Sequence, residues 1–195
     1  MKSLQYLFIS LSHKILKHLP YTTIRILSVP IGTLYFLLTF RSSIKLFKRK
    51  EIFNELKINY KPLIVKINYT RYWLETLWLT NKNFSKYISP HVEIENLEYV
   101  QKLKKQYPGL IFALPHLGNW EFAIPIGNSI KLNLLAVAEP LNNSYVLNWF
   151  KTLRESLGIE IVIGGKGQNT FDLLANKLKS GKDICLLSER SINTV

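Results

Sequence analysis

Cysteine is nearly absent from this chain of 195 residues, which contains Cys185 alone. A single cysteine cannot form a disulfide within the chain, and it excludes a zinc site built from several cysteines. Cys185 lies in an apolar run and is interpreted as a buried, inert thiol. Because His13, His18 and His91 stand apart from any spacing suited to metal ligands, no metal is expected.

Acidic residues are also few, with 13 Asp and Glu against 26 Lys and Arg, for a net charge of +13. The imbalance is concentrated in residues 1–62, where 11 basic and two acidic residues supply +9 of that charge. A basic N-terminal third indicates an anionic partner, either nucleic acid or an anionic membrane surface. No nucleic-acid partner is expected, because the cations flank apolar runs and no helix-turn-helix or RNA-recognition signature is present.

The uncharged stretch 26–40 has 15 residues, short of the about 20 that a straight membrane-spanning helix needs. Pro30 and Gly32 also interrupt it, so it predicts a buried core helix or a re-entrant segment. The stretch 4–19 places apolar residues opposite lysines, as an interfacial amphipathic helix does.

The run 41–50 adds five cations that would meet an anionic leaflet. We expect residues 1–62 to form a membrane-associating helical and basic segment at the cytoplasmic face of the plasma (inner) membrane. Two ordinary helices followed by a solvated basic loop are the alternative.

Residues 63–195 have a different pattern, in which short apolar runs alternate with stretches long enough for helices. The strands are expected at 110–114, 134–138, 159–163 and 184–188. The helices are expected at 64–79, 97–106, 117–130, 144–157 and 168–179, with Ser144 able to cap its helix. This alternation predicts an α/β fold, with a mostly parallel sheet flanked by helices and preceded by the N-terminal membrane-associating helices. The near-continuous apolar character of the strands predicts burial on both faces.

The carboxyl ends of parallel strands are where function gathers, and polar residues follow several of these strands. His116 comes directly after the first strand and suits proton transfer near neutral pH. Glu121 lies five residues on and could fix the tautomer of the ring, or His116 could be a helix cap and Glu121 a residue that suits the helix dipole. The glycine-rich loop 164–167 lacks the spacing of a nucleotide-binding P-loop.

The segment 115–121 (PHLGNWE) resembles the H-x4-[DE] motif of the glycerolipid acyltransferase superfamily. It is most similar to the form found in the bacterial lipid A biosynthesis acyltransferase family, in the phosphatidylinositol mannoside branch. The segment 69–75 (YTRYWLE) resembles the family's YxRYWxE segment, and 186–190 (LLSER) resembles its ERD strand end, with Ser191 in place of the usual Asp.

The resemblance implies a membrane enzyme that moves a fatty acyl group from acyl-CoA or acyl carrier protein to a hydroxyl of a glycolipid. The acceptor would be a phosphatidylinositol mannoside or a lipid A-type precursor, and no cofactor is implied. By the same resemblance His116 is the general base, Glu121 and Glu189 are the catalytic acids, and Arg190 binds an anion.

Main-chain N–H groups near Gly118 and Asn119 are expected to bind substrate at the oxyanion. The family's domain continues beyond the strand at 184–188, so a C-terminally incomplete chain is expected. A catalytically inactive or truncated membrane-associated homologue is the alternative function.

Overall fold

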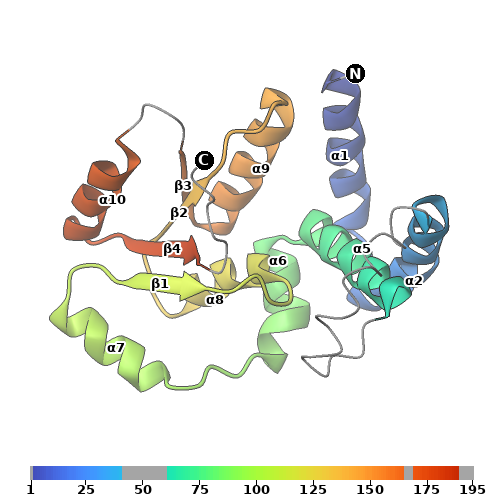
Figure 1. The fold of residues 1–195 in the computed structure, drawn as a ribbon. Helices are drawn as coiled ribbons and strands as arrows, with labels where there is room; N and C mark the ends of the chain where they lie inside the picture. Colours follow the sequence, from blue (N-terminus) through green and yellow to red (C-terminus); the bar gives the residue numbers. More distant parts are fainter. Residues whose placement is uncertain (1, 41–60, 165–168, 189–195) are drawn as a thin grey trace. The chain divides into compact units, whose positions relative to one another are not determined.

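The computed structural model describes residues 2–40, 61–164 and 169–188 (Figure 1). The chain forms two compact units, one made of residues 1–11 and 80–195 and the other of residues 12–79. The units divide between Leu11 and Ser12 and again between Leu79 and Thr80. The division into 1–62 and 63–195 expected from the sequence stays a prediction. The helix that starts at Pro62 packs against the helix before it.

The unit of residues 12–79 contains the end of α1 (Lys2–Leu16), α2 (Tyr21–Leu38) and α5 (Pro62–Trp78). Its buried α2 residues are Ile24, Ser28 and Gly32, spaced four apart on one narrow face. A Cβ at Gly32 would lie 2.6 Å from the Ile67 Cα, so the two helices touch backbone to backbone at this point.

The helix α2 continues through Pro30, so the predicted interruption at Pro30 and Gly32 is wrong. A proline removes one hydrogen bond from a helix, and the extensive packing of α2 on α5 offsets that loss. The helix is also not a buried core helix, since Ile26 and Leu38 are 69% and 77% exposed. By length and composition alone, α2 could cross a membrane.

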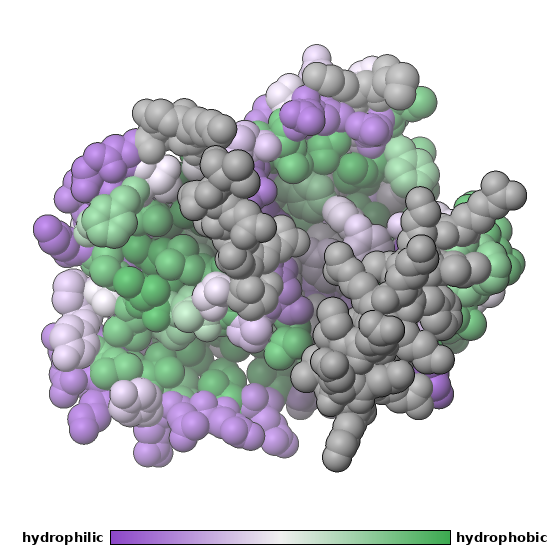
Figure 2. Space-filling model, in the orientation of Figure 1, coloured by the Kyte–Doolittle hydropathy of each residue, from purple (hydrophilic) through white to green (hydrophobic). Residues whose placement is uncertain are grey.

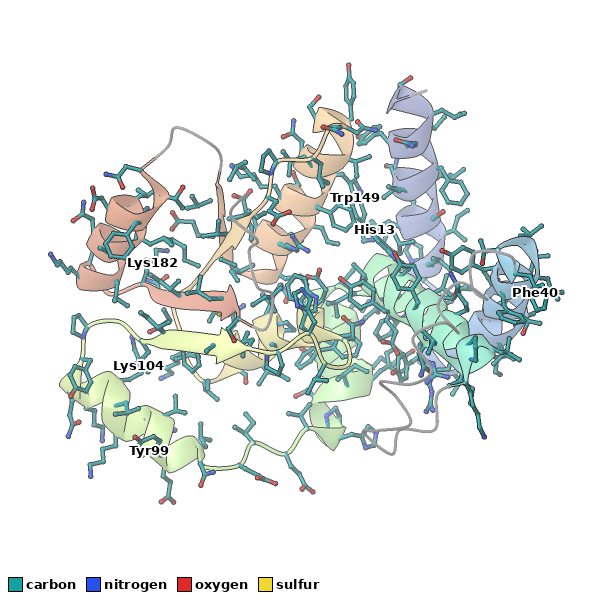
Figure 3. All side chains as sticks on the ribbon, viewed as in Figure 1. His13, Phe40, Tyr99, Lys104, Trp149 and Lys182 are labelled. Carbon is teal, nitrogen blue, oxygen red and sulfur yellow. The ribbon has the colours of Figure 1, made fainter. Side chains whose placement is uncertain are left out.

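Two partly buried polar contacts hold His13 and Leu19 to the end of α5. The indole Nε1 of Trp78, a fully buried residue, donates to the Leu19 carbonyl at 2.9 Å. The ring of His13 lies with Nδ1 2.7 Å from the Leu77 carbonyl (Figure 3). Burial lowers the pKa of His13, which favours the neutral ring.

The other unit is built on a sheet whose four described strands are all parallel, in the order β1-β4-β2-β3. These strands are β1 (Ile111–Leu114), β2 (Leu134–Ala138), β3 (Glu160–Ile163) and β4 (Asp183–Leu187). The predicted α/β class and parallel sheet are confirmed, and each strand lies within one residue of its expected bounds. The core includes Leu135, Ile161 and Ile184 from the sheet and Leu157 from a covering helix.

The helices between the strands are α8 (Ala123–Ser129), α9 (Ser144–Leu157) and α10 (Thr170–Lys179). Right-handed crossovers in this strand order place α8 and α9 on one face and α10 on the other. Figure 1 accordingly shows α9 and α10 on opposite sides of β2 and β3.

Three shorter elements and α7 (Leu97–Gln106) lie between Thr80 and β1. The shorter ones are α6 (Asn81–Asn83), the π-helical turn Phe84–Ile88 and the 3-10 turn Ser89–His91. The bounds of α7 are those predicted. The predicted helix 117–130 is shorter, because a turn with Gly118 at φ +61° precedes a 3-10 turn, Trp120–Phe122, and α8.

The cap of α9 is Asn143 and not Ser144 as predicted, since the Asn143 side chain accepts from the Tyr145 and Val146 N–H groups. The first turn of α1 lies next to this cap, because the Asn143 amide donates to Gln5 at 2.8 Å. The rings of Tyr6 and Tyr145 meet at 6.1 Å between centroids. Residues 1–11 are therefore packed on the α/β unit.

A buried aspartate ties the strand starts together. Asp183, fully buried at the start of β4, accepts from the N–H groups of Leu110 and Asn133, which precede β1 and β2. Lys104 of α7 reaches the same carboxylate at 2.8 Å (Figure 3). One side chain thus aligns β1, β4 and β2 at their amino ends.

The edge strand β1 is not buried on both faces as predicted, because Ile111 and Ala113 are exposed. Hydrophobic side chains gather on the part of this unit that carries β1 and β4 (Figure 2). A strand at a sheet edge has a neighbouring strand on one side only. The helix α10 covers the inner strands, so it leaves Ile111 and Ala113 of β1 exposed.

Candidate active site

The carboxyl end of β1 places His116 on an exposed turn. The Leu117 N–H donates to the Pro115 carbonyl at 2.8 Å and closes a three-residue turn around the histidine. His116 therefore stands at the edge of the sheet where parallel α/β folds bind their ligands. The expected position of His116 after a strand is confirmed, but it does not begin a helix, because a turn separates it from the 3-10 turn Trp120–Phe122 and from α8.

Gly118 and Asn119 shape the rest of this turn. Gly118 has φ +61°, a left-handed conformation that glycine adopts without strain, and the space where its Cβ would lie is open. The Asn119 side chain caps the 3-10 turn by accepting from the Glu121 N–H at 3.2 Å. The turn therefore leaves unfilled space beside the backbone next to His116.

Glu121 is the most buried carboxylate near this turn, with 1% of the residue exposed. Arg154 of α9 contacts it with two nitrogens: Nη2 donates to Oε1 at 2.8 Å, and Nε lies 3.2 Å from both Oε1 and Oε2. The Arg154 guanidinium also lies 4.7 Å from the centre of the Trp120 ring. Glu121 is thus clamped between the β1 turn and the last turn of α9.

Removing either partner of such a buried ion pair is costly, because the remaining charge loses its compensation. The Arg154 side chain is 17% exposed, so water shields the pair only weakly. A planar guanidinium that holds both carboxylate oxygens also fixes the orientation of the carboxylate. The clamp therefore orders the segment that connects His116 to α8.

The end of β4 lies beside the end of β1, as expected from a parallel sheet. Leu187 pairs with Leu114, and the Ser188 N–H donates to the Leu114 carbonyl at 3.1 Å. The chain after β4 therefore starts next to Pro115 and His116. Glu189 and Arg190, the predicted second acid and anion-binding residue, lie outside the described residues.

Arg154 is the residue of this cluster that the motifs did not reveal. A signal was present, because Phe150 and Leu157 lie one helical turn on either side of Arg154 and both are buried. An arginine on the inward face of an amphipathic helix needs a buried anion, and Glu121 supplies it.

Residues 69–75, the other segment that resembles a family motif, lie on α5 in the unit of residues 12–79. Glu75 and Thr70 are buried there, and Arg71 is partly buried. This segment therefore has one buried face within the helical unit, while Tyr69 is 49% exposed.

Comparison with known proteins finds similar mycobacterial proteins. The chain is 30% identical over 129 residues to the phosphatidylinositol mannoside acyltransferase of Mycolicibacterium smegmatis, a match covering 64% of this chain and 41% of that protein. It is also 30% identical over 128 residues to the protein of the same name from Mycobacterium tuberculosis H37Rv, covering 64% of this chain and 40% of that protein. The aligned region thus spans about two fifths of the length of these relatives.

The match to a protein family covers nearly the whole chain. Residues 3–195 match the family described as bacterial lipid A biosynthesis acyltransferase. This span includes the β1 turn, the Glu121–Arg154 pair and the 69–75 segment of α5. The chain therefore belongs to the bacterial lipid A biosynthesis acyltransferase family.

Proposed function

We propose that this protein is an O-acyltransferase that moves a fatty acyl group from acyl-CoA or acyl carrier protein to a hydroxyl of a glycolipid. The acceptor is a phosphatidylinositol mannoside or a lipid A-type precursor. Family membership supports acyl transfer, and the names of the mycobacterial relatives support the first acceptor. The observation that carries the proposal is the exposed His116 on a turn ordered by the buried Glu121–Arg154 pair.

In the proposed step, His116 accepts the proton of the acceptor hydroxyl as its oxygen attacks the thioester carbonyl. The oxyanion that forms accepts hydrogen bonds from the main-chain N–H groups of Gly118 and Asn119. When the intermediate collapses, the C–S bond breaks and the histidinium returns its proton to the departing thiolate. A thioester is already activated, so the proposed step uses no metal or prosthetic group.

The proposed role of Glu121 is to stabilise the histidinium and to hold its turn in place. A fixed carboxylate favours the cationic ring electrostatically, and Arg154 supplies the fixation. Glu189 is proposed as a second acid at the same edge of the sheet, because it follows Ser188, which is hydrogen-bonded to the end of β1. Arg190 is proposed to bind a phosphate of the donor or acceptor.

The test of the base assignment is His116→Ala, with His91→Ala as the matched control at another exposed histidine of the same unit. Purified protein would be assayed for transfer of labelled palmitate from palmitoyl-CoA or palmitoyl carrier protein to each acceptor. His116→Ala should lose about 10²–10⁴-fold in rate, the usual contribution of a general base, and His91→Ala should be unchanged.

Retention of more than roughly a tenth of the wild-type rate in His116→Ala would exclude it as the base, given the usual size of that contribution. A folded wild-type chain that transfers no acyl group from either donor to either acceptor would favour an inactive homologue.

We further propose that the protein attaches to the cytoplasmic face of the inner membrane, where its lipid substrates lie. Exposed apolar residues support attachment, and such patches mark membrane or partner surfaces. In the first half of α1 these are Leu4, Leu7, Phe8 and Leu11, and on α2 they include Ile26, Val29, Leu34, Leu37 and Leu38. Figure 2 shows the hydrophobic side chains over α1.

The attachment is tested by co-sedimentation with vesicles that contain phosphatidylglycerol. We expect high salt to release part of the protein, because screening weakens the attraction of the basic residues but not the apolar contact. Leu7→Gln with Phe8→Gln should release a further part, and Lys14→Gln is the control that changes charge alone. Complete release by salt, or a wild-type protein that never sediments, would contradict the proposal.

A further inference from the structure

Two polar pairs face each other between α2 and α5 in the helical unit. Tyr21 and Arg25 lie one turn apart on α2, and Arg71 and Glu75 lie one turn apart on α5. The Tyr21 hydroxyl donates to Glu75 Oε1 at 2.9 Å and links the two helices at this point. Arg25 and Arg71 therefore belong to the same cluster between the two helices. The two residues that α5 contributes, Arg71 and Glu75, belong to the segment 69–75.

Arg71 contains an unsatisfied donor. Its Nε atom is buried, and among the described residues it is the one buried side-chain nitrogen or oxygen without a hydrogen-bond partner. A buried donor that loses water without gaining an acceptor is costly, and native proteins rarely leave one unpaired. Since Arg71 as a whole residue is partly exposed, a ligand in the solvent can approach it.

The local charge favours an anionic ligand. Arg25 and Arg71 both act on the Tyr21 phenol, where burial and then Glu75 raise the pKa to about 12 and the two arginines oppose that rise. Within this cluster of described side chains, two guanidinium groups thus accompany one carboxylate, and Glu75 already accepts from Tyr21. A guanidinium fork matches the oxygens of a carboxylate or a phosphate.

We propose that Arg71 and Arg25 bind the phosphate group of a membrane phospholipid. The lipid source follows from α2, where Arg25 is exposed and directly precedes the apolar stretch whose residues Ile26 and Val29 are also exposed. A headgroup phosphate on the two arginines would leave its acyl chains beside this apolar surface. The inference rests on the proposed membrane attachment and is independent of acyl transfer.

The experiment measures binding of dihexanoylphosphatidylglycerol, as monomers below its critical micelle concentration, to the full chain by calorimetry. We expect Arg71→Gln to weaken binding by about tenfold or more, as the loss of a charged hydrogen bond does. Arg71→Lys should retain part of the affinity, because it keeps the charge without the fork. Lys66→Gln is the matched control, since it removes one positive charge from the same helix and should change affinity less than about twofold.

Two further ligands identify the source of the phosphate. Dihexanoylglycerol, which lacks the phosphate, should bind at least tenfold more weakly, and inorganic phosphate should also bind more weakly because it gains no apolar contact. Equal affinity for inorganic phosphate would overturn the lipid assignment. An equal loss in Lys66→Gln and Arg71→Gln would overturn the site.

Arg25→Gln keeps the test decisive if Arg71→Gln does not fold, because Arg25 is exposed. Unchanged affinity in a folded Arg25→Gln variant would overturn the two-arginine site. Failure of the wild-type protein to sediment with vesicles, with monomer binding intact, would overturn the membrane attachment and with it a membrane lipid as the occupant, although the two arginines would still bind a phosphate.

Discussion

The most specific prediction concerns the ion pair between Glu121 and Arg154, because its effect on the free energy of unfolding can be measured separately from its effect on acyl transfer. Glu121 is 1% exposed, and replacing Arg154 with Leu leaves that carboxylate buried without its three nitrogen contacts. Breaking a buried pair by removing one partner costs about 3–5 kcal/mol. That is a large part of the 5–15 kcal/mol or so that stabilises an ordinary domain.

The assay is urea unfolding with pulsed hydrogen exchange, read on peptides from α9 and β3 so that it reports on the α/β unit. The exposed pair Lys151–Glu155 on the same helix, 3.7 Å apart, provides the control. Lys151→Ala should cost less than about 1 kcal/mol, as exposed pairs do. Similar costs for Arg154→Leu and Lys151→Ala would refute the reasoning from burial.

The double variant Glu121→Leu with Arg154→Leu separates the two roles of the pair. It should regain most of the stability lost by Arg154→Leu alone, with a coupling energy of roughly 2–3 kcal/mol, because the buried carboxylate is removed together with the guanidinium. Acyl transfer should stay low in the double variant, since Glu121 is proposed to stabilise the histidinium. Recovery of both stability and transfer would show that Glu121 has a structural role alone.

Two further predictions concern the sheet and the helical unit. Asp183→Ala should cost about 3–5 kcal/mol in urea unfolding, because it leaves the Leu110 and Asn133 N–H groups without their acceptor and removes one of the two acceptors of Lys104. Glu160→Ala, which breaks partly exposed pairs with Lys177 and Lys182, should cost less than about 1 kcal/mol, and equal costs would contradict the prediction. The Tyr21 pKa is raised from 10.0 to about 12, so its contribution to stability is complete below pH 10 and is lost as pH rises through about 12. The difference in unfolding free energy between wild type and Tyr21→Phe should therefore narrow between these pH values, and a constant difference would exclude this titration.

Local sequence signals were enough to predict the strands and most helices of the α/β unit. The apolar runs that became β1 to β4 were separated by helix-length stretches, and Gly158 ends α9 in the left-handed conformation typical of a helix stop. The exposed position of His116 followed from its place after a strand. These features depend on neighbours within a few residues, which a single sequence contains.

Contacts between residues far apart in the sequence could not be predicted in the same way. Glu121 and Arg154 are on different elements, and pairing them requires knowing that α9 packs against the turn after β1. The division between Leu79 and Thr80 depends on the packing of α5 against α2, which composition does not show. The exposure of Ile111 depends on the strand order, which places β1 at an edge of the sheet formed by the described strands.

The strand order also determines when the site can assemble during synthesis. The strand that carries His116 is the first to leave the ribosome, yet in the described sheet it pairs with β4, the last of the four strands to be made. Non-local pairing of this kind is slow, because closing a long loop costs conformational entropy before any stabilising contact forms. A nascent chain stalled before Asp183 therefore lacks the described strand partner of β1, although both residues of the Glu121–Arg154 pair have already been made.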